Sequence, residues 1–266
     1  MKHGKIWIAA LALVGAAWTT PAVASEIDFG GMYAPGTPGV GEFVLGGTAP
    51  GKWGPAAFGT GASVTWSLMA TGTSTGAEGG GHGATFTGLA DFMPAGFLAA
   101  IQAAFNAWAA VANLTFTQVA DCGAAFNTAC AGGDIRIGGA TFDGAFGVLA
   151  HGYFPPANGL TAAGDIHFDT AETWKIGFGG AGFDIFQVMA HELGHALGLN
   201  HTAVANSLMN PTYTEAFSGP QADDIAGMQF IYGARQVDPA VPEPATLLLL
   251  GSGLFAAAAR RRAVKK

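Results

Sequence analysis

Residues 191–201 read HELGHALGLNH and hold three of the seven histidines of this 266-residue chain. On a helix, His191 and His195 would lie about 40° apart and about 6 Å along the axis, so both imidazoles face one side. If the helix continued, His201 would point away from that side. Gly198 can adopt the left-handed conformation that ends a helix, which lets the chain return His201 to the other two.

This spacing is the donor pattern of a catalytic zinc site. Three neutral imidazoles bind the ion and leave a fourth tetrahedral position for water. Glu192, beside the first histidine, can take a proton from a water whose pKa zinc lowers to about 7, and can carry it to the leaving amine of a peptide bond. A purely structural histidine cluster would need neither Glu192 nor Gly198. We therefore expect a zinc hydrolase with Glu192 as its general base.

The surrounding sequence mixes helical and strand patterns. Asp184 is a natural N-cap for the helix that carries the histidines. Residues 94–111, opened by Pro94, carry an apolar stripe at helical spacing, and a third helix is expected over residues 221–233. Strands are expected over residues 63–70, 114–119, 134–138, 147–151 and 164–168. This mixture within one domain, residues 61–235, predicts an α+β fold.

Charge is scarce and unevenly distributed. Only 11% of the residues are charged, and the formal net charge is -7. Between residues 25 and 244, four basic residues stand against all 18 acidic ones, which leaves a charge of -14. Because such a body repels a phosphate backbone, we expect no nucleic-acid partner.

The first 24 residues have the three parts of a signal peptide in order. Lys2 and Lys5 are followed by an apolar run from Ile6 to Trp18 and by the small residues 22–24. A buried N-terminal helix would not need this order, so we expect cleavage after Ala24 and export. Residues 25–60 are rich in glycine and proline and are read as an extended leader.

Export bears on the two cysteines of the chain. Outside the cytoplasm, Cys122 and Cys130 can form a disulfide. They could instead be metal ligands, but the chain has no third thiol. We favour the disulfide.

The C-terminal segment, residues 236–266, is read as a sorting tail. Pro242 to Pro244 precede an apolar run over residues 245–259, and five of the last seven residues are basic. The run is shorter than the roughly 20 residues that span a bilayer, and the basic cluster fits a buried core helix badly. The tail resembles the PEP-CTERM sorting signal of Gram-negative bacteria. The resemblance implies an exosortase partner that cuts the tail, transient anchoring in the inner membrane, and delivery to the cell surface, the extracellular space or the exopolysaccharide matrix.

The full string HExxHxxGxxH is the metzincin signature, and SLMNPTY (207–213) supplies Met209 for the methionine turn of those enzymes. SLMNPTY with DDIAGMQFIYG (223–233), together with the upstream stretches FDGAFGVLAHGYFPP and GDIHFDTAETW, resembles the matrixin subfamily from Lys52 to Gly233. The resemblance implies a twisted, mixed five-stranded sheet with three helices and a protein or peptide substrate. It also implies that residues 211–213, which include Pro211 and Tyr213, line a substrate pocket. The strand over residues 147–151 would be the edge that substrate joins as an extra strand.

The resemblance further implies bound calcium. Its ligands would be the carboxylates of Asp143, Asp169 and Glu172, since hard oxygen donors suit this ion. The alternative for these acids is a set of solvated turns. Asp165 corresponds to an acid of a second calcium loop. Carbonyl ligands of the first site would come from Gly144, Phe146 and Val148.

Two features depart from the matrixin pattern. Matrixins hold a structural zinc with histidines like His151 and His167, plus a histidine and an aspartate from a loop that IRIGGATFDG (135–144) lacks. Two imidazoles rarely hold structural zinc, so we expect His151 and His167 to hydrogen-bond across the sheet edge and the chain to bind one zinc. His82, in a glycine-rich loop over residues 71–88, is expected to be solvated. No cysteine precedes Cys122 to cap the zinc as in latent matrixins, so activity is restrained otherwise or not at all.

The resulting interpretation is an exported zinc endopeptidase. One alternative is a non-catalytic surface or matrix-binding module on a peptidase fold, which a missing Glu192 would favour. Another is a different hydrolase with a three-histidine zinc, which SLMNPTY disfavours.

Overall fold

The computed structural model describes residues 51–76, 78, 82–156 and 161–236. The expected signal peptide, nearly all of the leader and the sorting tail lie outside these residues. In the part of the chain that is described, no helix combines the length and apolarity needed to cross a membrane.

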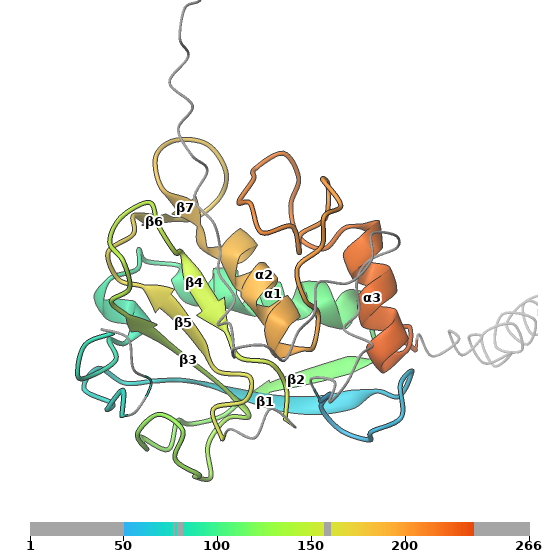
Figure 1. The fold of residues 1–266 in the computed structure, drawn as a ribbon, viewed down its shortest axis with the longest axis horizontal. Coiled ribbons are helices and arrows are strands. Elements are labelled where there is room, and N and C mark those ends of the chain that lie inside the picture. Colours follow the sequence, from blue (N-terminus) through green and yellow to red (C-terminus); the bar gives the residue numbers. More distant parts are fainter. Residues whose placement is uncertain (1–50, 77, 79–81, 157–160, 237–266) are drawn as a thin grey trace, which may run out of the picture.

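A five-stranded sheet organises the described residues (Figure 1). Its strands run in the order β2-β1-β3-β5-β4, and β4 pairs antiparallel with β5 whereas the other pairs are parallel. The sheet is therefore mixed, as expected, and β4 lies at its edge. The strands are β1 (Ala62–Leu68), β2 (Leu114–Gln118), β3 (Ile135–Ala140), β4 (Ala150–Gly152) and β5 (Ile166–Asp169), and a separate pair joins β6 (Trp174–Lys175) to β7 (Phe183–Asp184).

The helices of the described residues agree with the expected three. They are α1 (Phe97–Val111), α2 (Ile185–Ala196) and α3 (Ala222–Tyr232), with a 3₁₀ turn η1 at Leu89–Asp91. Asp184 caps α2 by accepting a hydrogen bond from the N–H of Gln187, at 2.9 Å. Helix α1 begins three residues after Pro94, because Gly96 has a left-handed φ of 94° that helical geometry excludes.

Strand β4 is shorter than expected at its N-terminal side. Before it, the N–H of Val148 donates to the carboxylate of Asp143, while the carbonyl of Leu149 still accepts from the N–H of Asp169 in β5. Phe146 has a left-handed φ of 68°. Side-chain acceptors shape the chain just before β4, which the alternation of apolar residues does not reveal.

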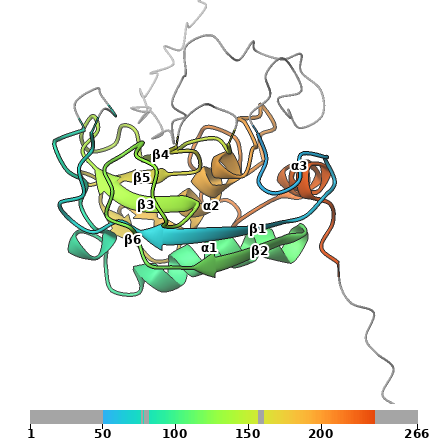
Figure 2. The same ribbon diagram turned by 90° about the horizontal axis from the view of Figure 1, so that it is seen from below.

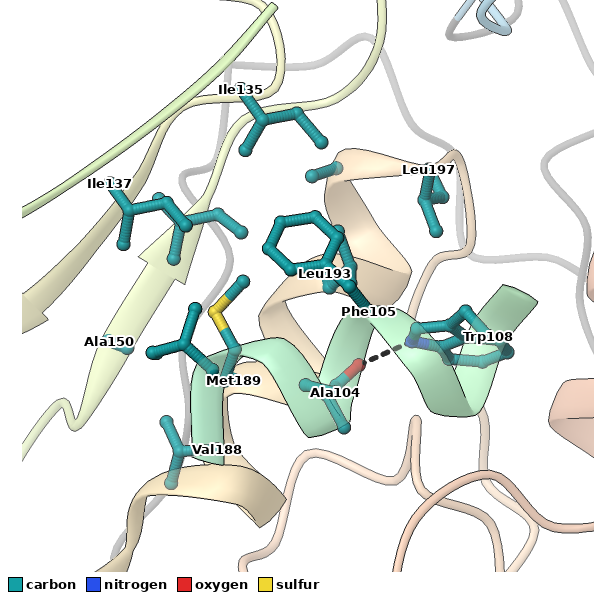
Figure 3. Packing of buried hydrophobic residues seen from close by; sticks show 14 of the residues in the cluster. Ala104, Phe105, Trp108, Ile135, Ile137, Ala150, Val188, Met189, Leu193 and Leu197 are labelled. Atoms are coloured by element: carbon teal, nitrogen blue, oxygen red, sulfur yellow. Dashed lines mark hydrogen bonds between the residues drawn. The ribbon is translucent and has the colours of Figure 1, made fainter. Parts of the chain in front are cut away.

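The core lies where α1 and α2 pack against each other and against the sheet (Figures 2 and 3). Trp66 of β1 stacks on Phe105 of α1 with ring centroids 4.7 Å apart. Trp108 of α1 donates from its indole N–H to the carbonyl of Ala190 in α2, at 2.9 Å, which satisfies the buried donor. Each fully buried large side chain contributes roughly 1.5–3 kcal/mol, so this contact fixes α2 against α1.

Two further contacts tie loops to this core. Trp53, within the segment read as leader, is 9% exposed and donates from its indole to the carbonyl of Ala196, at 2.8 Å. The leader's last residues thus pack on the domain. Cys122 and Cys130 are joined in a disulfide.

Candidate metal centre and active site

Helix α2 and the turn after it bring three histidines together. Gly198 has φ of 110°, so the chain leaves the helix axis and reverses towards His201. The Nε2 atom of His201 lies 3.2 Å from Nε2 of His191 and 3.1 Å from Nε2 of His195. Three imidazole nitrogens therefore converge on one point, as the spacing of the motif predicts.

Backbone carbonyls orient two of these rings. Nδ1 of His191 lies 2.7 Å from the carbonyl oxygen of Leu208, and Nδ1 of His195 lies 2.8 Å from that of Leu199. A proton on each Nδ1 leaves the Nε2 lone pair facing the common point. This second shell is typical of metal-ligating histidines.

The three imidazoles are neutral at neutral pH. Burial lowers the pKa of His191 to about 4 and that of His201 to about 3, and it places the pKa of His195 well below its usual value. Neutral nitrogen donors with converging lone pairs fit a zinc ion.

Glu192 lies between the histidine cluster and the edge strand β4. Its side chain is fully buried on α2. Gly152 of β4 abuts it so closely that a Cβ there would lie 2.7 Å from the carbonyl oxygen of Glu192 and 3.4 Å from its Oε2. Only glycine leaves room for the edge strand beside this carboxylate.

The turn over residues 207–210 passes beneath the histidines and is held by Asp224 of α3. Its carboxylate accepts from the N–H of Leu208 at 2.7 Å and from that of Met209 at 3.0 Å. Met209 is buried and packs on α2, where a Cβ at Gly194 would collide with its sulfur. The sequence reasoning missed Asp224, although an acid at the third position of a helix after Pro220 is a capping signal.

A small, open hollow lies beside His191. Of the two residues expected to line a substrate pocket, Tyr213 lines this hollow, and Pro211 is not among its lining residues. The hydroxyl of Tyr213 donates to Glu215 at 2.7 Å and accepts from the N–H of Asp184 at 2.9 Å. The remaining lining residues are Gln187, Val188, Leu208, Asn210, Thr212, Thr214 and Phe217.

Glu215 links the wall of this hollow to the neighbouring loop. Its carboxylate accepts from the N–H of Gly179 at 2.6 Å and pairs with Lys175 at 2.6 Å. The Gly179 hydrogen bond, with the contact to Lys175, lowers the pKa of Glu215 to about 2. Sequence reasoning did not find Glu215.

The expected calcium ligands lie around the turn that precedes β4. Asp143 accepts from the N–H of Val148 at 3.0 Å, and Glu172 accepts from that of Phe146 at 2.6 Å. The second oxygens of Asp169 and Glu172 are buried without a hydrogen-bond partner. Burial, with the neighbouring carboxylates, raises the pKa of both groups.

Asp165, the expected acid of a second calcium loop, lies elsewhere. It is 2% exposed, and its Oδ1 accepts from the N–H of Arg136 at 3.1 Å. Burial raises its pKa well above the usual value.

A second cluster of donors forms at the sheet edge. His151 of β4 stands opposite His167 of β5, as their expected pairing across the edge requires, and Glu78 joins them from the loop before α1. His82, expected to be solvated, is half-buried: Nδ1 lies 3.0 Å from the carbonyl oxygen of Thr141, and its ring contacts that of His151. Among the described residues, three donors come within 4.8 Å of one another only here and at the histidines of α2.

Comparison with known proteins places this geometry in a family. Residues 89–233 match the family model described as Matrixin, and residues 240–262 match the PEP-CTERM protein-sorting motif. Stromelysin-3 of Rattus norvegicus is 41% identical over 149 residues, and matrix metalloproteinase-27 of Homo sapiens is 43% identical over 155 residues. Interstitial collagenase of Oryctolagus cuniculus is 42% identical over 146 residues. These matches cover 54%, 56% and 54% of this chain but only 28%, 28% and 29% of the three relatives, so the chain spans less than a third of their length.

Proposed function

The chain belongs to the matrixin family, and on that premise we propose that it is a zinc-dependent endopeptidase. The observation that carries the proposal is the convergence of the His191, His195 and His201 Nε2 atoms, with Glu192 on the same helix. The family implies zinc, and the histidine cluster has the chemistry to bind it.

His191, His195 and His201 would hold the zinc, which would act as a Lewis acid and lower the pKa of a nearby water. Glu192 accepts the proton of the attacking water and delivers it to the leaving amine nitrogen. Its burial excludes bulk water from the carboxylate, which strengthens its interactions with the reacting groups.

Substrate would be held by β4 and by the hollow beside His191. An extended peptide would add as a further strand to β4, the edge of the sheet. The side chain after the scissile bond would enter the hollow that Tyr213 lines.

We also propose that calcium binds at Asp143, Asp169 and Glu172, with carbonyl ligands from the turn at Gly144, Phe146 and Val148. Two buried carboxylate oxygens without hydrogen-bond partners support it, because a bound cation would satisfy them. Asp165 is the candidate acid for a second such loop.

The sorting tail assigns a destination to the proposed enzyme. A PEP-CTERM motif over residues 240–262 supports recognition by an exosortase and export, followed by delivery to the surface of a Gram-negative cell. The signal peptide over residues 1–24 would begin that route.

The deciding experiment incubates the purified chain with a peptide library in the presence and absence of a chelator. We expect chelator-sensitive cleavage of internal peptide bonds that zinc restores. Zinc binding without cleavage would instead favour the non-catalytic binding module.

A further inference from the structure

A second set of metal donors gathers away from α2, where β4, β5 and the loop before α1 meet. The antiparallel register places His151 directly opposite His167. Glu78 enters from a segment 73 residues earlier in the chain than His151, and its side chain is fully buried. None of the three takes part in the chemistry assigned to Glu192.

The three side chains aim at one point. The Oε1 atom of Glu78 lies 2.5 Å from Nδ1 of His167 and 3.2 Å from Nε2 of His151, and the two nitrogens lie 2.9 Å apart. Zinc bonds of about 2.0–2.2 Å in a tetrahedron place ligand atoms about 3.3–3.6 Å apart, which the Glu78–His151 separation approaches, whereas Glu78 and His167 would move apart slightly on binding the ion. The Nε2 atoms of the α2 histidines show similar spacings of 3.1 and 3.2 Å.

Hydrogen bonding alone satisfies this triangle poorly. If both ring nitrogens carry protons, two donors face each other at 2.9 Å. If one lacks its proton, its lone pair faces the carboxylate oxygen. A metal cation at the centre would satisfy all three atoms at once.

The charge of Glu78 also requires a partner. A buried carboxylate is costly unless a counter-charge is close. The second oxygen of Glu78 has no hydrogen-bond partner among the described residues. A bound metal ion would supply the counter-charge.

His82 is placed to complete the set. Its Nδ1 lies 3.0 Å from the carbonyl oxygen of Thr141, so Nε2 is left free to bind a metal ion. The carbonyl of Leu208 orients His191 in the same way. Its ring centroid lies 5.7 Å from that of His151, close to the 4.7–5.2 Å that separates the rings on α2.

The composition of the loop supports the same conclusion. Residues 76–83 read GAEGGGHG, in which Glu78 and His82 are the sole side chains larger than a methyl group. Five glycines give this stretch a high conformational entropy in the unfolded chain. It has no large apolar side chain whose burial could offset the loss of that entropy. Metal ligation would supply the missing free energy.

We propose that Glu78, His151 and His167, with His82 as the fourth donor, bind a second zinc ion that fastens Glu78 and His82 to β4 and β5. These two residues thereby supply the two donors that the segment over residues 135–144 lacks. His151 directly precedes Gly152, so this ion would also hold β4 beside Glu192. The importance of that effect for catalysis rests on the proposed function, whereas the proposed binding of the second zinc ion does not depend on it.

The test is elemental analysis of the full chain, loaded with zinc and freed of loosely bound ions. We expect about two zinc ions per chain, about one in Glu78→Gln, and about one in His201→Ala, because each variant empties a different site. Asp91→Asn, which removes an exposed acid near the same loop, is the matched control and should keep two. X-ray absorption at the zinc edge of His201→Ala, where the second ion alone remains, should show nitrogen and oxygen ligands with imidazole scattering.

Two results would overturn the proposal. One is a single zinc in the unmodified chain that His201→Ala removes, since the Glu78 cluster would then hold no ion. The other is a second zinc that persists in a folded Glu78→Gln protein. If Glu78→Gln fails to fold, His82→Ala replaces it, and an unchanged content of two zinc ions there would have the same force. Peptidase activity enters none of these readouts, so the two proposals fail separately.

Discussion

The carboxylate of Asp224 on α3 accepts the main-chain N–H of Met209, at 3.0 Å, and thereby holds the turn beneath the histidines. Asp224 also accepts the N–H of Leu208, whose carbonyl orients His191. A residue with no contact to the proposed zinc thus sets the direction of one of its ligands.

Asp224→Asn should therefore lower both stability and zinc affinity. Losing charge-assisted hydrogen bonds worth about 1.5–3 kcal/mol each should destabilise the fold by roughly 2–4 kcal/mol. Misorienting His191 should weaken zinc binding about 10–100-fold. Denaturant unfolding and metal competition would measure the two effects. Asp223→Asn, one residue earlier on α3, is the control, and an equal effect there would contradict the role given to Asp224.

Glu192 and His201 should separate catalysis from metal binding. Glu192→Ala should keep zinc at the α2 histidines and lose about 10²-fold or more in peptide hydrolysis, because the proton acceptor is gone. His201→Ala should lose that zinc, since two imidazoles remain. Metal content and rate would be measured on the same preparations. A rate of hydrolysis close to that of the unmodified protein in Glu192→Ala would contradict the role of Glu192 as general base.

The metal-free protein should lose stability in mild acid. The folded-state pKa values of His191 and His201, about 4 and about 3, lie below the value of about 6.5 for an unfolded histidine. Between these values the unfolded chain binds more protons, so stability falls as the pH drops from about 6.5 towards 4. Thermal melts of chelator-treated protein across this range would show it. His201→Asn should give a shallower slope, and an identical slope would count against the assignment.

Calcium should stabilise the domain through the turn before β4. Because Asp169 and Glu172 have buried, unpartnered oxygens, millimolar calcium should raise the melting temperature. Asp169→Asn should abolish the rise. Asp134→Asn should retain it, because Asp134 lies at the opposite end of β3 from Asp169. A melting curve that calcium leaves unchanged would refute the site.

Glu215 should act on substrate binding rather than on the chemical step. Glu215→Gln removes the charge that holds Gly179 and Tyr213, so the wall of the hollow should loosen and KM should rise several-fold with a smaller change in kcat. Lys175→Met should do less, because an ion pair that solvent partly reaches contributes little, whereas the hydrogen bonds to Gly179 and Tyr213 remain. Steady-state kinetics with one peptide would distinguish them. A larger effect in Lys175→Met would contradict this ranking.

The sequence alone determined the features that depend on local geometry. The spacing of His191 and His195, the cap at Asp184 and the turn at Gly198 follow from helical periodicity and from the conformations that single residues adopt. The alternating strand patterns likewise predicted the strands of the sheet. These properties arise from residues a few positions apart, so they can be predicted from the sequence.

Tertiary structure decided which distant residues meet. Glu78 reaches His151 and His167, and His82 reaches His151, because the register of β4 and β5 sets the two strand histidines side by side where these distant residues pack. Likewise Trp53 packs on α2, and Asp224 holds the turn over residues 207–210. Such contacts depend on loop closure and on packing of the whole domain, and neither leaves a periodic trace in the residues that take part.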